Sequence, residues 1–264
     1  MPADLAPIVG ALRAAGCVFA EEEARLLVSS AQTPADLTAM VKERVAGLPL
    51  EQVLGWAEFC GLRVAVDRGV FVPRRRTEFL ARTAITIGWQ AARPGEPLVV
   101  LDLCCGSGAV GAAVAATLGP VELHAADVDP AAVLCARRNV AAAGGLVYEG
   151  DLYDPLPATL RGRVDVLAAN IPYIPADQIA LLPPEARLHE PRIALDGGAD
   201  GLDLLRRVAA GAPQWLAPGG CLLSEVSERQ AQPAREAFAA SGLGTRLTAS
   251  EDLNVTVVVG TRHR

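Results

Sequence analysis

The sequence predicts an α/β protein in which a doubly wound, mostly parallel sheet follows a smaller helical part and a β-hairpin. Residues 97–105 form a continuous apolar run of strand length, which is typical of a strand buried on both faces of a parallel sheet. Strand-like and helix-like segments alternate after it, as they do in doubly wound sheets. The last two strand-like segments, 244–250 and 254–261, have no helix between them, so we expect an antiparallel hairpin at one sheet edge.

The N-terminal part of the chain has a different character. Apolar residues recur at helical spacing over residues 5–12, and the first fifty residues are predicted to be helical. Residues 53–72 alternate as strands do and are interrupted by glycine, which predicts a short hairpin, and a helix is expected at about 76–92. The segment ARPGEP then marks a boundary. We therefore predict two domains, at residues 1–92 and 93–264.

In the second domain, the expected elements follow one another in a regular order. A helix rich in Ala and Val follows the first strand, and the later segments continue the alternation. The predicted strands are 97–105, 121–129, 146–151, 163–170 and 219–227, and the predicted helices are 109–118, 130–143, 200–212 and 228–240. Such strands run parallel, with helices on both faces of the sheet.

Composition and charge disfavour several classes of protein. A hydrophobic content of 51% with 20% charged residues over 264 residues is typical of a soluble globular protein with a large core. A net charge of −6 disfavours stable binding to nucleic acid, because phosphate binding requires an excess of Lys and Arg. No stretch approaches the roughly 18 uncharged apolar residues of a membrane span, so no membrane association is expected.

The six cysteines show no C-x-x-C spacing and the three histidines are isolated, so we expect neither a metal site nor a disulfide framework. This use of cysteine predicts a reducing, cytoplasmic compartment. One basic run, PRRR at residues 73–76, has two interpretations: a solvated turn, or a basic lip over a site. The sequence gives no prediction of the oligomeric state.

A glycine loop follows the first strand of the second domain. Gly106, Gly108 and Gly111 form the G-x-G-x-x-G pattern of a dinucleotide-binding turn, at a strand end and before a helix. Asp127 ends the next strand about 20 residues later, where such folds place an acid that binds ribose hydroxyls. By this spacing alone, a nicotinamide-dependent dehydrogenase is one interpretation.

Asp102, at the exit of the first strand, favours a different ligand. Its carboxylate lies four residues before Gly106, where it would repel a pyrophosphate but attract the ammonium group of S-adenosylmethionine. A structural alternative is that Asp102 only caps the turn that follows. Asp151 and Asn170 end two further strands, and because the carboxyl ends of parallel strands share one edge, all these side chains should converge on one crevice with Asp127.

Asn170 raises a question of its own, because the apolar run VLAAN ends on this amide and the chain then continues as Ile171-Pro172-Tyr173. Asn170 either caps the end of a buried strand or presents its amide to a ligand. NIPY at 170–173 resembles the Asn-Pro-Pro-Tyr motif of methyltransferases that act on amides and amines. Three further segments are similar to the HemK/PrmC family, which methylates a glutamine side chain of peptide-chain release factors: FVPRRRTEFL at 71–80, DLCCGSGAVG at 102–111 and HEPRIALDGGADGLDLLRRV at 189–208.

This resemblance covers most of the chain. It implies a small helical domain for substrate recognition, followed by a Rossmann-like class I methyltransferase domain. The sheet of that second domain would have seven strands and end in an antiparallel hairpin. It implies S-adenosylmethionine as cofactor and a protein substrate, such as a release factor. The cofactor would contact Asp102, Cys104, Cys105, Gly106, Ser107, Gly108, Asp127, Asp151, Leu152 and Asn170. Asn170 and the carbonyl of Ile171 would accept the N–H bonds of the substrate amide, Pro172 would hold the turn, and Tyr173 would pack on the substrate.

Three departures from the family pattern predict a related branch. Cys104 replaces the usual first glycine, which would place the loop further from the cofactor, and Ile171 replaces the first proline, which would reduce rigidity. Arg75 and Arg76 replace the milder Pro-x pair of the family, which makes the possible lip at 73–76 more basic. A small-molecule amine or amide and N6-adenine stay open as acceptors, and a dehydrogenase or a non-catalytic binding module stays open as a different class.

Overall fold

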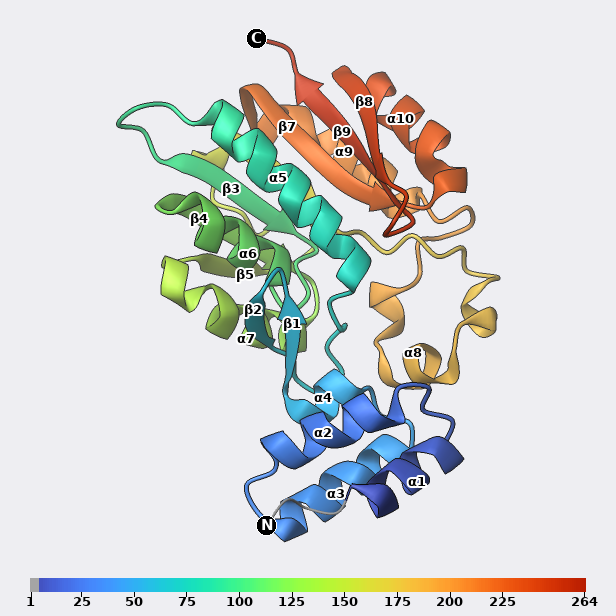
Figure 1. The fold of residues 1–264 in the computed structure, drawn as a ribbon. Coiled ribbons are helices and arrows are strands. Elements are labelled where there is room, and N and C mark those ends of the chain that lie inside the picture. The colour runs from blue at the N-terminus through green and yellow to red at the C-terminus, as the bar shows by residue number, and fades with distance from the viewer. Residues whose placement is uncertain (1–4) are drawn as a thin grey trace.

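The computed structural model describes residues 5–264 and has an elongated shape, with a helical unit below a larger α/β unit in Figure 1. The two units are connected by a hairpin and an extended segment, and the chain ends at the far side of the α/β unit from the N-terminus. Among the described residues, no helix combines the length and the apolar character that crossing a membrane requires.

Short helices make up the N-terminal unit, as the sequence predicts. They are α1 (Ala6–Ala14), α2 (Ala20–Ser30), α3 (Pro34–Val45) and α4 (Leu50–Leu54). Leu12, Leu27 and two alanines of α2 form their own small core. The Thr33 side chain accepts a hydrogen bond from the Asp36 amide at 3.1 Å and caps α3, with proline at its first position.

The predicted hairpin is present but shorter than the alternating pattern, with strands β1 (Trp56–Phe59) and β2 (Leu62–Ala65). It packs on the α/β unit, because Asn139 of that unit exchanges hydrogen bonds with both main-chain groups of Ala65, at 2.8 and 2.9 Å. Residues of the hairpin and of the sheet also share one apolar core. The division of the chain into domains at residue 92 stays a prediction.

The main sheet has seven strands in the order β5-β4-β3-β6-β7-β9-β8. They are β3 (Leu98–Leu103), β4 (Val121–Asp127), β5 (Leu146–Glu149), β6 (Val164–Ala169), β7 (Leu216–Val226), β8 (Leu243–Ser250) and β9 (Val255–Arg262). The first five are parallel, and β9 is antiparallel to both β7 and β8. The doubly wound fold and the C-terminal hairpin are therefore confirmed.

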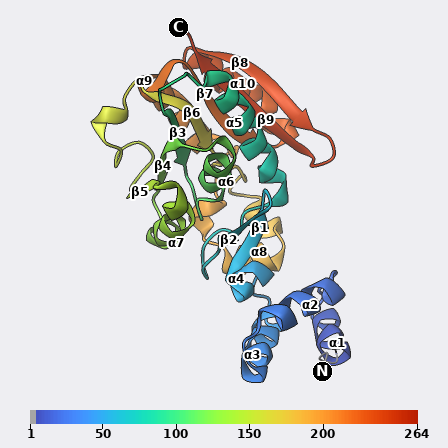
Figure 2. The same ribbon diagram turned by 60° about the vertical axis from the view of Figure 1, so that its left-hand side comes forward.

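Helices cover both faces of this sheet. On one face lie α5 (Glu78–Ala91), α6 (Ala109–Leu118) and α7 (Pro130–Val140), and on the other lie α9 (Asp203–Trp215) and α10 (Ala231–Ala240) (Figures 1 and 2). Neighbouring residues of β3 belong to different cores: Val100 to the first face and Leu101 to the second. Because both faces are covered, every residue of β3 and β6 is buried, which explains their continuous apolar runs.

Two elements differ from the sequence prediction. The helix expected at 200–212 is α9, which starts at Asp203 and continues past Pro213 to Trp215. A proline in the last turn removes only one intrahelical hydrogen bond. Trp215 is buried and stacks on Tyr153, which stabilises this end of the helix. The short helix α8 (Pro184–His189) was not predicted. It lies between the helical unit and the sheet (Figure 1).

Candidate active site

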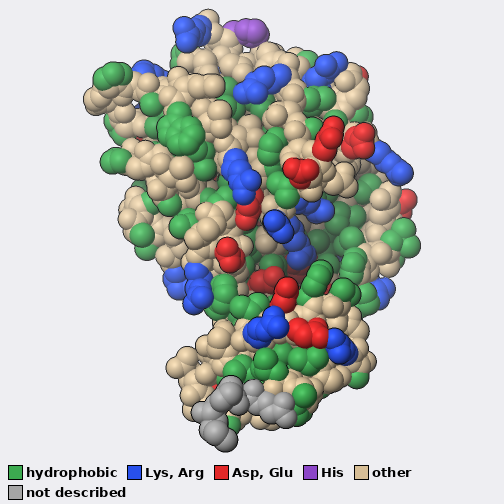
Figure 3. Space-filling model, in the orientation of Figure 1, with side chains coloured by type: hydrophobic (Ala, Val, Ile, Leu, Met, Phe, Trp, Pro, Cys, Tyr) green, Lys and Arg blue, Asp and Glu red, His purple; other side chains and the backbone are tan. Residues whose placement is uncertain are grey.

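A cavity of about 850 Å³ opens at the carboxyl ends of the parallel strands, where the strand order reverses between β3 and β6. In doubly wound sheets this is the place where ligands bind. Figure 3 shows it as a hollow above the helical unit, with charged side chains around its mouth. With one exception, the predicted site residues line it; the exception is Gly108, which packs against Ala136 of α7.

Asp102 lies at the bottom of the glycine loop and is 1% exposed. One carboxylate oxygen, Oδ2, accepts a hydrogen bond from the Gly111 amide at 2.8 Å, so Asp102 does cap the following helix. The other, Oδ1, is buried without a hydrogen-bond partner among the described residues. Burial raises the pKa of Asp102 to about 7, against the opposite effect of the Gly111 bond. The unpaired oxygen is a place where a donor from a ligand, such as an ammonium group, would be stabilised.

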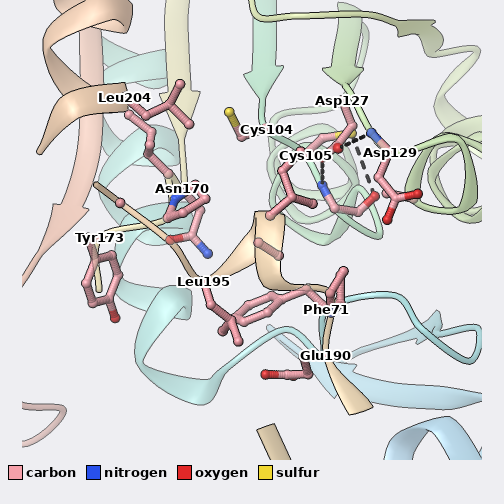
Figure 4. Close-up of a pocket in the computed structure, with 18 of the residues that line it drawn as sticks. Phe71, Cys104, Cys105, Asp127, Asp129, Asn170, Tyr173, Glu190, Leu195 and Leu204 are labelled. Carbon is pink, nitrogen blue, oxygen red and sulfur yellow. Dashed lines mark hydrogen bonds between the residues drawn. The ribbon is translucent and has the colours of Figure 1, made fainter. Parts of the chain in front are cut away.

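Cys104 has a backbone conformation that glycine adopts more readily than other residues. Its φ is 55°, in the left-handed region that glycine adopts freely and that costs other residues about 1–2 kcal/mol. The loop then returns to the sheet, where the Cys105 amide donates to the Ala126 carbonyl at 3.1 Å. The substitution therefore leaves a glycine-like path, with the Cys104 side chain on the cavity wall (Figure 4).

Asp127 connects the loop after β4 to the glycine loop. Its Oδ2 accepts from the Gly106 amide at 2.8 Å and its Oδ1 from the Asp129 amide at 2.9 Å, as the dashed lines in Figure 4 show. Burial raises the pKa of Asp127, while these backbone bonds act in the opposite direction. Each oxygen keeps further capacity to accept a hydrogen bond, so the carboxylate can receive a pair of ligand hydroxyls without losing its backbone bonds.

The remaining strand end on this side carries Asp151 and Leu152. Asp151 is exposed and its carboxylate pairs with Arg207 of α9 at 2.6 Å, so it lies at the rim of the cavity. Leu152 is buried, with a φ of 50° that turns the chain sharply after β5. The structure thus brings both residues to the cavity, but the polar group of Asp151 already has a partner.

Asn170 ends β6 and its side chain points into the cavity (Figure 4). None of residues 5–264 makes a hydrogen bond to its side-chain amide, which a strand cap would require. The carbonyl oxygen of Ile171 is likewise free of hydrogen bonds from the described residues, while the Ile171 side chain is buried in the second core. This geometry favours presentation to a ligand over capping.

The glycine-rich segment after α8 holds the loop that contains Asn170. Ile174 and Asp196 form a bridge, with the Ile174 amide bonded to the Leu195 carbonyl at 3.2 Å and the Gly197 amide to the Ile174 carbonyl at 2.9 Å. Gly201 has a φ of 79°, and a Cβ there would overlap the carbonyl oxygen of Tyr173. Only glycine allows this close approach, which explains why a glycine stands at position 201.

The basic run at 73–76 lies at the cavity, as the basic-lip interpretation expects, because Arg74 and Arg76 line it. Their charges are paired with carboxylates of the protein. Arg74 pairs at 2.5 Å with Glu190, whose side chain is fully buried, and Arg76 pairs at 3.0 Å with Glu225, whose side chain is 2% exposed. Arg75 is exposed. Two of the three arginines therefore connect the segment before α5 to buried carboxylates in the cavity wall.

The cavity as a whole is acidic. Nine Asp and Glu residues and three arginines line it, and each of these arginines is paired with a carboxylate. Such a cavity suits a ligand that carries positive charge, and it disfavours a pyrophosphate or a nucleic-acid backbone. The residues present thus fit S-adenosylmethionine better than a dinucleotide. Among the described residues, no group of three or more His, Cys, Asp and Glu could hold a metal ion.

Two buried carboxylates of this wall, Glu190 and Glu225, were missed in the sequence analysis, as was Gln230, whose side-chain amide bonds the Tyr173 carbonyl at 2.8 Å. Glu225 could have been found, because it stands near the carboxyl end of β7 and so obeys the same rule that selected Asp102 and Asn170. Glu190 lies in a segment whose resemblance was recognised, but nothing local in the sequence indicates its partner 116 residues away.

Comparisons with known proteins agree with this geometry. Residues 91–181 match the family model "Methyltransferase small domain". The release factor glutamine methyltransferase of Geobacter sulfurreducens is 37% identical over 234 residues, which are 87% of this chain and 79% of the relative. That of Cereibacter sphaeroides is 36% identical, over 92% of this chain and 91% of the relative. The 4-amino-L-phenylalanine/4-methylamino-L-phenylalanine methyltransferase of Streptomyces pristinaespiralis is 36% identical, over 76% and 69%.

Solved structures share the fold at much lower sequence identity. The 16S rRNA N2 G1207 methyltransferase of T. thermophilus has a TM-score of 0.55 at 17% identity, covering 79% of this chain and 50% of that one. A methyltransferase of Pyrococcus furiosus has a TM-score of 0.54 at 15% identity, covering 77% and 90%. These likenesses bear on the class I methyltransferase fold alone.

Proposed function

Because the chain belongs to the family of release factor glutamine methyltransferases, we propose that it methylates the side-chain amide nitrogen of a glutamine in a peptide-chain release factor. The protein is an S-adenosylmethionine-dependent methyltransferase. The observation that carries the proposal is the loop at 170–173, where two acceptors, the Asn170 side chain and the Ile171 carbonyl, have no hydrogen-bond partner among the described residues. They match the two N–H bonds of a primary amide.

On the cofactor side, we assign Asp127 to the ribose hydroxyls and Asp102 to the ammonium group. S-adenosylmethionine, when bound, supplies a methyl group carried by a positively charged sulfur. Asp127 has the free acceptor capacity that a pair of hydroxyls needs, and Asp102 has the unpaired buried oxygen. The other carboxylates of the cavity add a field that favours a cation.

On the acceptor side, the difficulty is that an amide nitrogen is a poor nucleophile, because its lone pair is delocalised into the carbonyl. Hydrogen bonds from its two N–H groups to Asn170 and Ile171 fix the nitrogen in line for attack and stabilise the positive charge that develops on it. The nitrogen becomes acidic as it is methylated and then loses a proton. No residue has to remove that proton beforehand.

The charges of the cavity also support a protein acceptor over the small amino acid named for the Streptomyces pristinaespiralis relative. A free amino acid brings a carboxylate that needs a cationic partner. The cavity arginines Arg74, Arg76 and Arg207 are all paired with carboxylates of the protein. A glutamine inside a polypeptide has no such carboxylate. The acidity of the cavity and the net charge of −6 likewise argue against an adenine in nucleic acid.

The proposal is tested by incubating the purified chain with S-adenosylmethionine and a purified bacterial release factor, and by locating the methyl group with tandem mass spectrometry. We expect one methyl group on a glutamine side chain. Asn170→Ala is the matched control and should methylate the same peptide at least about a hundredfold more slowly. Methylation of another residue type, or an unmodified release factor with the wild-type chain, would overturn the proposal.

A further inference from the structure

Tyr173 is held at both of its ends by residues of one segment, which begins at the end of β7. Its hydroxyl donates to Oε1 of Glu225 at 3.1 Å, and its carbonyl accepts from the Gln230 side-chain amide at 2.8 Å. The same Gln230 amide also donates to the Asp200 carbonyl at 3.1 Å, in the segment that packs on Tyr173. The orientation of this tyrosine is therefore set by contacts far from it in the sequence.

Glu225 is an unusual residue for a buried strand. Its side chain is 2% exposed, yet it is a carboxylate, and only one of its oxygens has partners: Oε1 accepts from both Tyr173 and Arg76. Its Oε2 is buried with no hydrogen-bond partner among the described residues. A buried carboxylate with one unpaired oxygen costs stability, so its presence calls for a reason beyond packing.

Arg76 brings a third part of the chain to the same point. Its guanidinium bonds Oε1 of Glu225 at 3.0 Å and lies 5.6 Å from the centre of the Tyr173 ring. Arg76 belongs to the segment that connects the hairpin to α5. The loop after β6, the end of β7 and the segment before α5 thus meet at one carboxylate on the wall of the cavity.

We propose that Glu225 is a positioning residue for the acceptor, which acts by fixing the Tyr173 ring and Arg76 in the wall beside Asn170. This inference rests on the proposed function. The Tyr173 hydroxyl is already bonded to Glu225, and burial raises its pKa above the ordinary value, so the hydroxyl keeps its proton. It contributes its ring, and Glu225 decides where the ring lies.

A matched control exists at the opposite end of the sheet. Asp165 is also a buried carboxylate, 8% exposed, paired with Arg93 at 2.6 Å and bonded to the Val99 amide at 2.9 Å. Asp165→Asn should lower the stability of the protein, as Glu225→Ala does. Asp165 is not among the residues that line the cavity. An effect that appears in Glu225→Ala but not in Asp165→Asn can then be attributed to the position of Glu225 in the cavity wall, because both variants lose a buried ion pair.

The first measurement needs no substrate. Hydrogen–deuterium exchange, followed on peptides that cover residues 171–177, reports the protection of the Ile174 and Ala176 amides, which are hydrogen-bonded in this loop. We expect Glu225→Ala to speed exchange in this loop by about tenfold or more, and Asp165→Asn to leave it unchanged. Equal protection in Glu225→Ala and the wild type would overturn the inference, whatever the substrate is.

The second measurement uses methyl transfer to the release factor. Glu225→Ala should raise the KM for the acceptor by about tenfold and leave the affinity for S-adenosylhomocysteine within about twofold. Tyr173→Phe should also raise this KM, and the double variant should be no worse than Glu225→Ala alone, because Glu225→Ala already removes the only bond that Tyr173→Phe breaks among the described residues. Additive effects, or an unchanged acceptor KM in Glu225→Ala, would contradict the inference. If the wild type transfers no methyl group, the proposed function has failed and exchange alone decides.

Discussion

The wall of the cavity assigned to the cofactor and the wall assigned to the acceptor are built from the chain in different ways. On the cofactor wall, the bonds that shape the site span 9 residues, from Gly111 to Asp102, and 21 residues, from Gly106 to Asp127. On the acceptor wall, the bonds of Glu225 to Tyr173 and Arg76 span 52 and 149 residues. Figure 4 shows the two walls facing each other, with Asp127 on one and Asn170 and Tyr173 on the other.

This difference has a physical origin. The cofactor wall is a strand–loop–helix unit, so its side chains are placed by local turns and by the pairing of neighbouring parallel strands. The acceptor wall exists only after the hairpin segment, the loop after β6, the glycine-rich segment and the end of β7 have come together. We therefore expect changes on the cofactor wall to alter the affinity for the cofactor, and changes on the acceptor wall to alter kcat or the KM for the acceptor while cofactor affinity stays nearly constant.

The largest expected effect is on the acceptor wall. Asn170→Ala should lower kcat for methyl transfer by about a hundredfold or more, as loss of an aligning hydrogen bond does, and leave the melting temperature nearly unchanged. Steady-state kinetics beside thermal denaturation gives both values. Asn170→Asp keeps the size of the side chain and its acceptor oxygen but adds a negative charge near the sulfonium. This charge stabilises the cationic cofactor in the ground state, so the variant should bind S-adenosylmethionine and turn over poorly. Full activity in both variants would make Asn170 a simple strand end.

The next effect is on the cofactor wall. Asp127→Ala should weaken the binding of S-adenosylhomocysteine by about tenfold or more, because it removes charge-assisted hydrogen bonds to the ribose. Calorimetric titration measures this directly. Asp129→Ala offers a comparison in the same loop. Among the described residues its carboxylate bonds only the Ala131 amide at the start of α7, so its loss should weaken binding much less than Asp127→Ala does. Equal affinities for Asp127→Ala and the wild type would place the cofactor elsewhere.

A pH dependence should separate the two walls further. Burial raises the pKa of Asp102 to about 7. A cationic cofactor that favours the carboxylate should therefore bind about tenfold more weakly at pH 6 than at its plateau above about pH 8. Calorimetry across this range should show the slope, and Asp102→Asn should remove it. A pH-independent affinity in the wild type would contradict the assignment of Asp102.

The same carboxylate acts on stability with the opposite sign. In the ligand-free protein, the folded state holds the proton of Asp102 more tightly than the unfolded state does, since its pKa rises from the ordinary 3.8 to about 7. Its contribution to the free energy of unfolding is therefore present at low pH and is lost as pH rises from about 4 to about 7. Denaturant unfolding of the wild type and Asp102→Asn would isolate this contribution.

The smallest effect concerns Cys104. Cys104→Gly relieves a left-handed backbone conformation but increases the entropy of the unfolded chain, so we expect a gain in stability of about 1 kcal/mol or less. Cofactor affinity should change by less than about twofold, because the loop path is already that of a glycine. Cys60→Gly, at a φ of 51° in the hairpin turn, is the matched control. A large change in affinity would mean that the thiol itself contacts the cofactor.

More of the cofactor wall than of the acceptor wall could be predicted from the sequence. Asp102, Asp127 and Asn170 could be chosen because each stands at the end of a parallel strand, and a local apolar run marks every such strand. The partners of Arg74 and Arg76 could not be predicted, because an ion pair between residues more than a hundred positions apart leaves no local pattern in the sequence. The resemblance identified the segments of the acceptor wall, but not that Glu225 joins them.

The central claim, that the acceptor is the amide nitrogen of a protein glutamine, is tested most directly by competition. The purified chain is given S-adenosylmethionine, a release factor and 4-amino-L-phenylalanine together, and methylated products are quantified by mass spectrometry. We predict methyl transfer to the release-factor glutamine with a kcat/KM at least about a hundredfold above that for the small amino acid, because the carboxylate of the amino acid finds no unpaired arginine in the described cavity wall. Methylation of the arylamine with the glutamine left unmodified would contradict it.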